Sequence, residues 1–144
     1  MSSRRNSPNP RVAAILLRAL GVWVILMAAE SLHGAARTLF LAPRIGDFRA
    51  RQIAVFTGSI IILAIVTRSI RWIAPTSTRD RLSVGFLWLG LTLAFEMLFG
   101  RFVIGAPWER IASDYNLAEG GLLPIGLLVL ALSPLIAEKM RGLK

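Results

Sequence analysis

The sequence predicts an all-α integral membrane protein: a bundle of four transmembrane helices, with a short interfacial helix between the third and the fourth. Two observations predict this fold. First, 55% of the 144 residues are hydrophobic and the mean hydropathy is +0.62, which is more apolar than an ordinary soluble domain. Second, the apolar residues lie in blocks separated by short basic or proline-containing segments. The composition also limits the kinds of site: there is no cysteine and one histidine, so disulfides are excluded, and a multi-histidine metal site would need a second chain.

The first ten residues differ from the rest of the chain. Residues 1–10 are polar and contain two prolines, so we expect a disordered cytoplasmic tail there, followed by one transmembrane domain over residues 11–144. A cleaved signal peptide is the alternative, because basic residues precede an apolar run. That run is long, however, and no Ala-x-Ala site follows it, which favours an uncleaved first span.

The first half of the chain contains two apolar blocks. They predict spans at about residues 12–41 and 48–74, both long enough to cross the hydrocarbon core. Between them, Pro43 and Gly46 are expected to form a tight turn that ends the first helix, and Asp47 is expected to be the N-cap of the second.

The second half repeats this arrangement with a longer connection. Spans are expected at about residues 82–105 and 120–138, and Ser77 or Thr78 is expected to cap the first of them. Between these spans, residues 106–115 place apolar and aromatic side chains on one helical face and charges elsewhere, which is typical of a helix lying at the membrane interface.

Basic residues set the expected orientation. Ten cations fall on the side of the two termini and six on the other side, so the positive-inside rule places both termini in the cytoplasm. The ten are Arg4, Arg5, Arg11, Arg68, Arg71, Arg79, Arg81, Lys139, Arg141 and Lys144, and the six are Arg37, Arg44, Arg49, Arg51, Arg101 and Arg110. We therefore expect a multi-pass protein of a bacterial inner membrane. The net charge of +9 does not indicate nucleic acid, because the arginines lie between apolar blocks and not on one soluble face.

The two halves read as two repeated helical hairpins. Each contains a Glu-x-x-x-Gly pattern, at Glu30 and Gly34 and again at Glu96 and Gly100, followed by an arginine and an Ala-Pro pair. Such repeats would be parallel, related by an axis along the membrane normal. Chance similarity between apolar sequences is the alternative.

Five ionisable residues within or at the ends of the apolar blocks form the main candidate site: Glu30, His33, Arg37, Glu96 and Arg101. Ionisable side chains inside a membrane are costly and need a proton, a counter-charge or water. Glu30, His33 and Arg37 share one stripe of a helix, with the outer two about 10 Å apart along its axis. We expect the first and third helices to touch with both carboxylates between them, in a crossed pairing of Glu30 with Arg101 and Glu96 with Arg37. These residues would then either form a pathway for a proton, ion or solute, or only stabilise the bundle as buried ion pairs.

Two further groups of residues are candidates. The expected outer-side loops carry Arg44, Asp47, Arg51, Trp108, Glu109, Arg110, Asp114 and Tyr115, which a soluble ligand would meet first. Close helix packing is expected at Gly34, Ala54, Gly58 and Gly100, because small residues let helices approach in lipid.

The size, the four spans and the glutamate in the first span are similar to those of small multidrug transporters. Those proteins are shorter and carry one such glutamate, so no function is carried over from them. The residues themselves favour a proton-, ion- or small-solute-handling transport module that is not an enzyme and has neither metal nor cofactor. A non-catalytic accessory subunit of a membrane complex is the alternative, and a lipid-modifying enzyme using Glu30 and His33 is a weaker one. The lipid bilayer is the expected partner, together with a homo-oligomer or a larger membrane complex, and nucleic acid is not.

Overall fold

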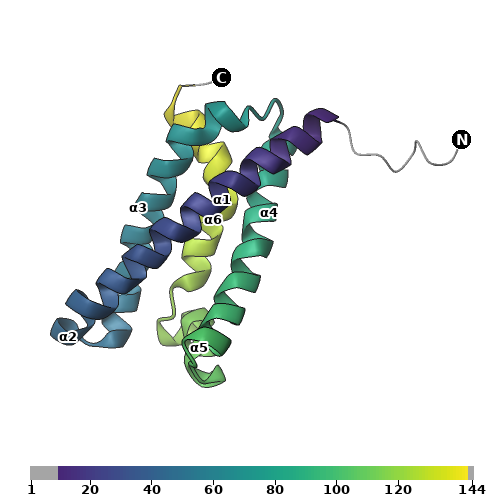
Figure 1. Cartoon of the computed structure of the whole chain (residues 1–144). Coiled ribbons are helices and arrows are strands. Elements are labelled where there is room, and N and C mark those ends of the chain that lie inside the picture. The colour runs from purple at the N-terminus through teal and green to yellow at the C-terminus, as the bar shows by residue number, and fades with distance from the viewer. Residues whose placement is uncertain (1–9, 143–144) are drawn as a thin grey trace, which may run out of the picture.

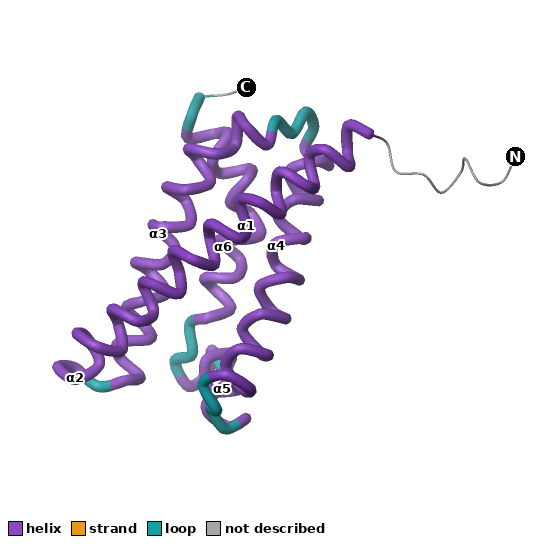
Figure 2. The backbone as a smooth tube through the Cα atoms, viewed as in Figure 1, coloured by secondary structure: helices purple, strands orange, loops and turns teal. Residues whose placement is uncertain are grey.

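The computed structural model describes residues 10–142 (Figure 1). Figure 2 shows that this part of the chain is helical apart from short connections. In chain order the elements are α1 (Pro10–Ala36), the π-helical segment η2 (Arg37–Leu41), α2 (Ala42–Ile45), α3 (Asp47–Ile73), α4 (Thr78–Leu98), the π-helical segment η3 (Phe99–Val103), α5 (Trp108–Tyr115), the 3₁₀ turn η4 (Leu117–Glu119) and α6 (Leu123–Met140).

The predicted fold class is confirmed. Within residues 10–142, four helical stretches are long and apolar enough to cross a membrane: Pro10–Ile45, Asp47–Ile73, Thr78–Val103 and Leu123–Met140. They make the chain a multi-pass membrane protein with an all-α four-helix architecture. The expected disordered tail, residues 1–10, lies outside the described residues except for Pro10, which begins α1.

The four long helices form a ring of neighbours. α1 packs against α3 and α4, and α6 packs against the same two helices. The start of α1, the α3–α4 connection and the end of α6 lie together at what we call the termini end (Figure 1). α2 and α5 lie at the opposite end, which we call the α5 end.

α1 crosses the bundle obliquely. In its first half it contacts α4, where the indole nitrogen of Trp88 donates to the carbonyl of Ala19 (2.8 Å) and that of Trp23 donates to the hydroxyl of Thr92 (3.0 Å). In its second half it contacts α3 through Glu30 and His33, as described below. α1 therefore leaves α4 toward the α5 end, and the space between these two helices widens there.

The dry core fills the termini half of the bundle. Buried residues of α1 recur at Ile15, Ala19, Val22 and Leu26, a helical spacing that gives one face toward the other helices. α3, α4 and α6 contribute equivalent faces, with Ile70, Ile73, Val84, Trp88 and Leu130 all fully buried. The fully buried apolar core thus lies mainly in the termini half of the bundle, and the polar residues of the cavity lie in the α5 half.

Ion pairs tie the helices together at the termini end. Arg11 at the start of α1 pairs with Asp80 in the first turn of α4 (Nη1 to Oδ2, 2.7 Å), and Asp80 also accepts from the hydroxyl and backbone N–H of Thr76. Arg81 pairs with Glu138 of α6. Ser77 is the N-cap of α4, its hydroxyl accepting from the N–H of Asp80 (3.1 Å), which selects Ser77 over Thr78.

Several helix ends differ from the expectation. Pro43 does not end the first helix: it sits in the first turn of α2, where a missing N–H costs nothing, and the helical path continues from α1 through η2 to Ile45. Gly46 ends it instead, with φ +94°, a conformation that favours glycine. Asp47 is therefore the first residue of α3, not its N-cap.

The last helix also starts later than expected. α6 begins at Leu123 because Gly120, at φ +92°, closes the 3₁₀ turn before it, and Pro124 lies in its first turn. Pro134 lies inside α6, where it has no N–H to give the carbonyl of Leu130. The hydroxyl of Ser133 donates to that carbonyl (2.6 Å), which restores the lost hydrogen bond.

The short helix expected within residues 106–115 is confirmed as α5. The proposed duplication stays a prediction. The first span runs directly into α2 and the turn at Gly46, whereas an irregular segment and the separate helix α5 follow the third span.

Candidate functional site

Glu30 and His33 of α1 meet α3 at Gly58. The Nδ1 atom of His33 lies 3.6 Å from Oε2 of Glu30, and its Nε2 atom lies 2.7 Å from the hydroxyl oxygen of Thr57. Gly58 is buried and provides the space for the carboxylate: a Cβ there would lie 2.9 Å from Oε2 of Glu30. Oε1 of Glu30 is buried without a hydrogen-bond partner. The glycine thus makes room for a carboxylate whose contact with His33, at 3.6 Å, is longer than a hydrogen bond.

Both glutamates line one cavity. It has a volume of about 670 Å³ and is walled by α1, α3, α4 and α6, with Glu30 on the α1–α3 side and Glu96 exposed on the α4 side. The two side chains interact electrostatically across it. Apolar residues such as Met27, Ile62 and Leu127 form much of the remaining wall. Such a volume and mixed lining are typical of small-molecule sites.

The crossed ion pairs expected between these residues are not formed. Arg101 lies in η3, donates to the carbonyl of Ala106 (3.3 Å) and stacks over the ring of Trp108 (5.2 Å to the centroid), and it does not line the cavity. Arg37 lines the cavity and is attracted electrostatically by Glu96, but no ion pair joins them. The expectation failed because α1 meets α4 with its first half, whereas Glu30, in the second half of α1, lies against α3.

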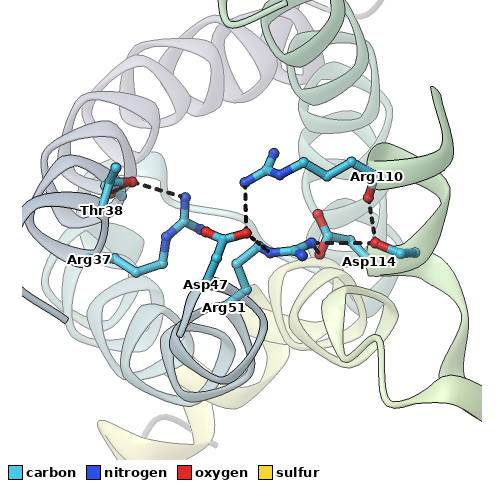
Figure 3. Close-up of polar contacts among 8 residues, drawn as sticks. Arg37, Thr38, Asp47, Arg51, Arg110 and Asp114 are labelled. Carbon is cyan, nitrogen blue, oxygen red and sulfur yellow. Dashed lines mark hydrogen bonds and ion pairs between the residues drawn. The ribbon is translucent and has the colours of Figure 1, made fainter. Parts of the chain in front are cut away.

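A network of charged side chains stands at the α5 end of this cavity (Figure 3). Asp47 forms an ion pair with Arg51 (Nε to Oδ2, 3.0 Å) and accepts a hydrogen bond from Nη2 of Arg110 (3.4 Å). Arg51 also pairs with Asp114 of α5. α3 and α5 are therefore joined by two ion pairs of opposite polarity, Arg51 with Asp114 and Asp47 with Arg110.

Arg37 enters this network from α1. Its guanidinium approaches the hydroxyl of Thr38 (3.5 Å), and its Nε atom is buried without a hydrogen-bond partner (Figure 3). Electrostatic repulsion reaches it from Arg51 and Arg110, and attraction from Asp47 and Asp114. The mouth of the cavity thus holds three guanidinium groups and two aspartates, whereas its interior holds two glutamates.

The other outer-side candidates lie apart from the cavity. Arg44, in α2, and Glu109, in α5, are exposed, and Trp108 contacts Arg101. Tyr115 is partly buried, and its hydroxyl has no hydrogen-bond partner. Burial raises the pKa of Tyr115 above its ordinary value, and the nearby negative charges of Glu96 and Asp114 add to this.

The small residues expected to pack helices take different positions. Gly58 faces the Glu30 carboxylate, and Ala54 lines the cavity beside it. A Cβ on Gly34 would meet no heavy atom within 4 Å, and one on Gly100 would meet only the side chain of Ile111, at 3.7 Å. The tightest helix contact is instead at Gly85 of α4, where a Cβ would overlap the carbonyl oxygen of Ala131 and lie 2.8 Å from its carbon.

Some residues of the site were missed. Gln52 of α3 donates to the carbonyl of Gly120 (2.8 Å), which fixes the approach to α6 beside the cavity. Thr57, the partner of His33, was not among the expected site residues. Polar residues four or five positions apart at the head of an apolar helix are the signal that could have indicated Gln52 and Thr57.

Between residues 10 and 142, no three His, Cys, Asp or Glu side chains are grouped closely enough to hold a metal ion. Comparison of the chain with protein-family models, with curated proteins and with solved structures finds no match.

Proposed function

We propose that the protein is a small transport module that binds a positively charged solute, or a proton in its place, at Glu30 and Glu96. The observation that carries this proposal is the shared cavity of about 670 Å³, in which neither carboxylate forms an ion pair with a lysine or arginine of residues 10–142. An ionised carboxylate in apolar surroundings needs a counter-charge. A proton and a cationic ligand are alternative ways to supply it, so binding of one would release the other.

His33 supports this role as a positioning residue. It lies between Glu30 and Thr57, so it holds the carboxylate toward Gly58 and leaves the second oxygen, Oε1, without a partner. That oxygen is the acceptor we assign to the solute. The ion pairs between α3 and α5 lie between this acceptor and the α5 end, so their opening would control access from that side.

Flux measurement in proteoliposomes tests the proposal. An internal pH dye reports proton movement when a gradient of potassium, methylammonium or choline is imposed. Glu30→Gln and Glu96→Gln remove the two charges, and Glu109→Gln is the matched control because Glu109 is exposed on α5 and does not line the cavity. We expect proton-linked flux in wild type and in the control, and background flux in the two cavity variants.

Background flux in every protein with every cation would contradict the transport proposal and favour the accessory subunit. Co-purification in a gentle detergent, followed by mass spectrometry, then identifies the partner. Flux that is unchanged by either cavity variant would contradict the assignment of Glu30 and Glu96.

We further propose that the termini end faces the cytoplasm of a bacterial cell and that the protein sits in the inner membrane. The excess of basic residues at that end supports this orientation. The chain has no cysteine, so a thiol reagent labels only a cysteine that is introduced. Single cysteines are introduced by Ser77→Cys at the termini end and by Asn116→Cys at the α5 end. A membrane-impermeant thiol reagent added to intact cells should label Asn116→Cys alone, and labelling of Ser77→Cys would reverse the assignment.

A further inference from the structure

A second hollow lies away from the candidate site, on the membrane-facing surface where α3 and the end of α6 run side by side. Its volume is about 520 Å³. The apolar part of the groove is formed by Ile60, Leu63, Ala64 and Met140. Arg68, near the end of α3, and Arg141, directly after α6, lie at its termini end. None of these residues belongs to the cavity that holds Glu30 and Glu96. We call this surface the α3–α6 groove.

The basic end of the groove carries two arginine side chains. Arg141 donates from Nη1 to the backbone carbonyl of Thr67 (2.6 Å), so its guanidinium is fixed against α3. Arg68 is exposed, and no Asp or Glu side chain within residues 10–142 lines the groove. Glu138, the acidic residue nearest in sequence to Arg141, pairs with Arg81 of α4.

The position of the groove in the membrane determines what fills its apolar part. Ile60 and Arg68 are eight residues apart on one helix, which is about 12 Å along the axis. The uncharged run 120–137 ends just before Arg141, so the two arginines lie at the depth of the lipid phosphates and Ile60 lies in the hydrocarbon. An apolar trough at that depth is in contact with acyl chains and not with water.

We propose that the α3–α6 groove binds one anionic phospholipid of the leaflet at the termini end, with an acyl chain along Leu63 and Ala64 and the phosphate between Arg68 and Arg141. Guanidinium groups form paired hydrogen bonds with phosphate oxygens. The positive charges of Arg68 and Arg141 repel the choline or ethanolamine cation of other headgroups, so they favour an anionic lipid. Basic pockets between helices on the cytoplasmic side are suited to such lipids. This site does not depend on the transport proposal.

Native mass spectrometry of protein released from nanodiscs tests it, with phosphatidylglycerol and phosphatidylcholine in equal amounts. We expect wild type to retain phosphatidylglycerol in preference to phosphatidylcholine. Arg68→Ala should weaken retention on the order of fivefold, the effect of one arginine on an anionic lipid at the surface. Arg71→Ala is the matched control, because Arg71 is exposed on the same helix one turn later and does not line the groove.

A second variant separates shape from charge. Ala64→Trp fills the trough and leaves both arginines in place, so retention should fall although the charge is unchanged. Ala64 is exposed to the membrane, so this variant should fold, and its thermal unfolding by circular dichroism verifies that. Equal retention of the two lipids by wild type would overturn the proposal. So would an equal loss in Arg68→Ala and Arg71→Ala, or unchanged retention in Ala64→Trp.

Discussion

Gly58→Ala is the sharpest test of the contact between α1 and α3. The new Cβ would lie 2.9 Å from Oε2 and 3.4 Å from Oε1 of Glu30, and 3.5 Å from Cε1 of His33. A carbon and an oxygen do not approach that closely, so the carboxylate must move away from the histidine that orients it. Displacing the end of a flexible side chain costs less than displacing backbone, so the overpacking should cost about 1 kcal/mol, the low end of the usual range. Replacing a helical glycine by alanine gains about 1 kcal/mol, so the unfolding free energy should stay close to that of wild type.

Removing the carboxylate should turn this near-zero change into a gain. In a Glu30→Ala background the alanine at position 58 meets no carboxylate, and only the gain in helix propensity, about 1 kcal/mol, remains. The coupling energy between the two substitutions should therefore be about 1 kcal/mol in a double-mutant cycle. Gly90→Ala is the control, because a Cβ at that exposed position of α4 meets no atom within 4 Å, so the substitution should stabilise the protein.

Unfolding in mixed micelles, with increasing sodium dodecyl sulfate and tryptophan fluorescence as the readout, gives these free energies. The four tryptophans supply the signal. A coupling energy within about 0.5 kcal/mol of zero, the usual range for independent sites, would refute the placement of Glu30 against Gly58.

Three further predictions concern the rest of the bundle. Gly85→Ala should destabilise the protein by about 3 kcal/mol in the same unfolding assay, because its Cβ would overlap the backbone of Ala131 and force α4 and α6 apart; stability equal to wild type would contradict this packing. Asp80→Asn should lower the free energy of unfolding by about 1–2 kcal/mol, since it removes the charge that Arg11 binds. This loss should disappear when Arg11→Gln is already present. An equal loss in both backgrounds would show that the ion pair contributes nothing. Tyr115 is the only tyrosine, so absorbance at 295 nm reports the ionisation of this residue alone. The titration midpoint should lie above 10.0, the ordinary pKa of tyrosine, in the folded protein. On unfolding, the midpoint should return toward that ordinary value. Because the folded pKa is raised, the unfolded chain ionises first, and stability should fall as pH rises through the unfolded pKa; an unshifted midpoint would place the ring in water.

The positions of the spans could be read from the sequence because the signal is local. A run such as residues 120–137, without any charge, has the length and composition of a membrane-crossing helix whatever its neighbours are. The amphipathic segment around residues 106–115 indicated α5 for the same reason. The end of the first helix was wrong because Pro43 was weighted too heavily: the helical path continues through Pro43, and the positive φ of Gly46 is what ends it.

What the sequence by itself determined is which ionisable residues lie within the apolar blocks and which helix carries each of them. Only the tertiary structure decided their partners. Glu30 meets Gly58 and not Arg101 because α1 crosses from α4 to α3, and Asp47 meets Arg110, 63 residues away, because α5 folds back beside α3. Helical periodicity gives the face of each helix, but crossing angles follow from how side chains of different helices interlock, and no local pattern encodes that.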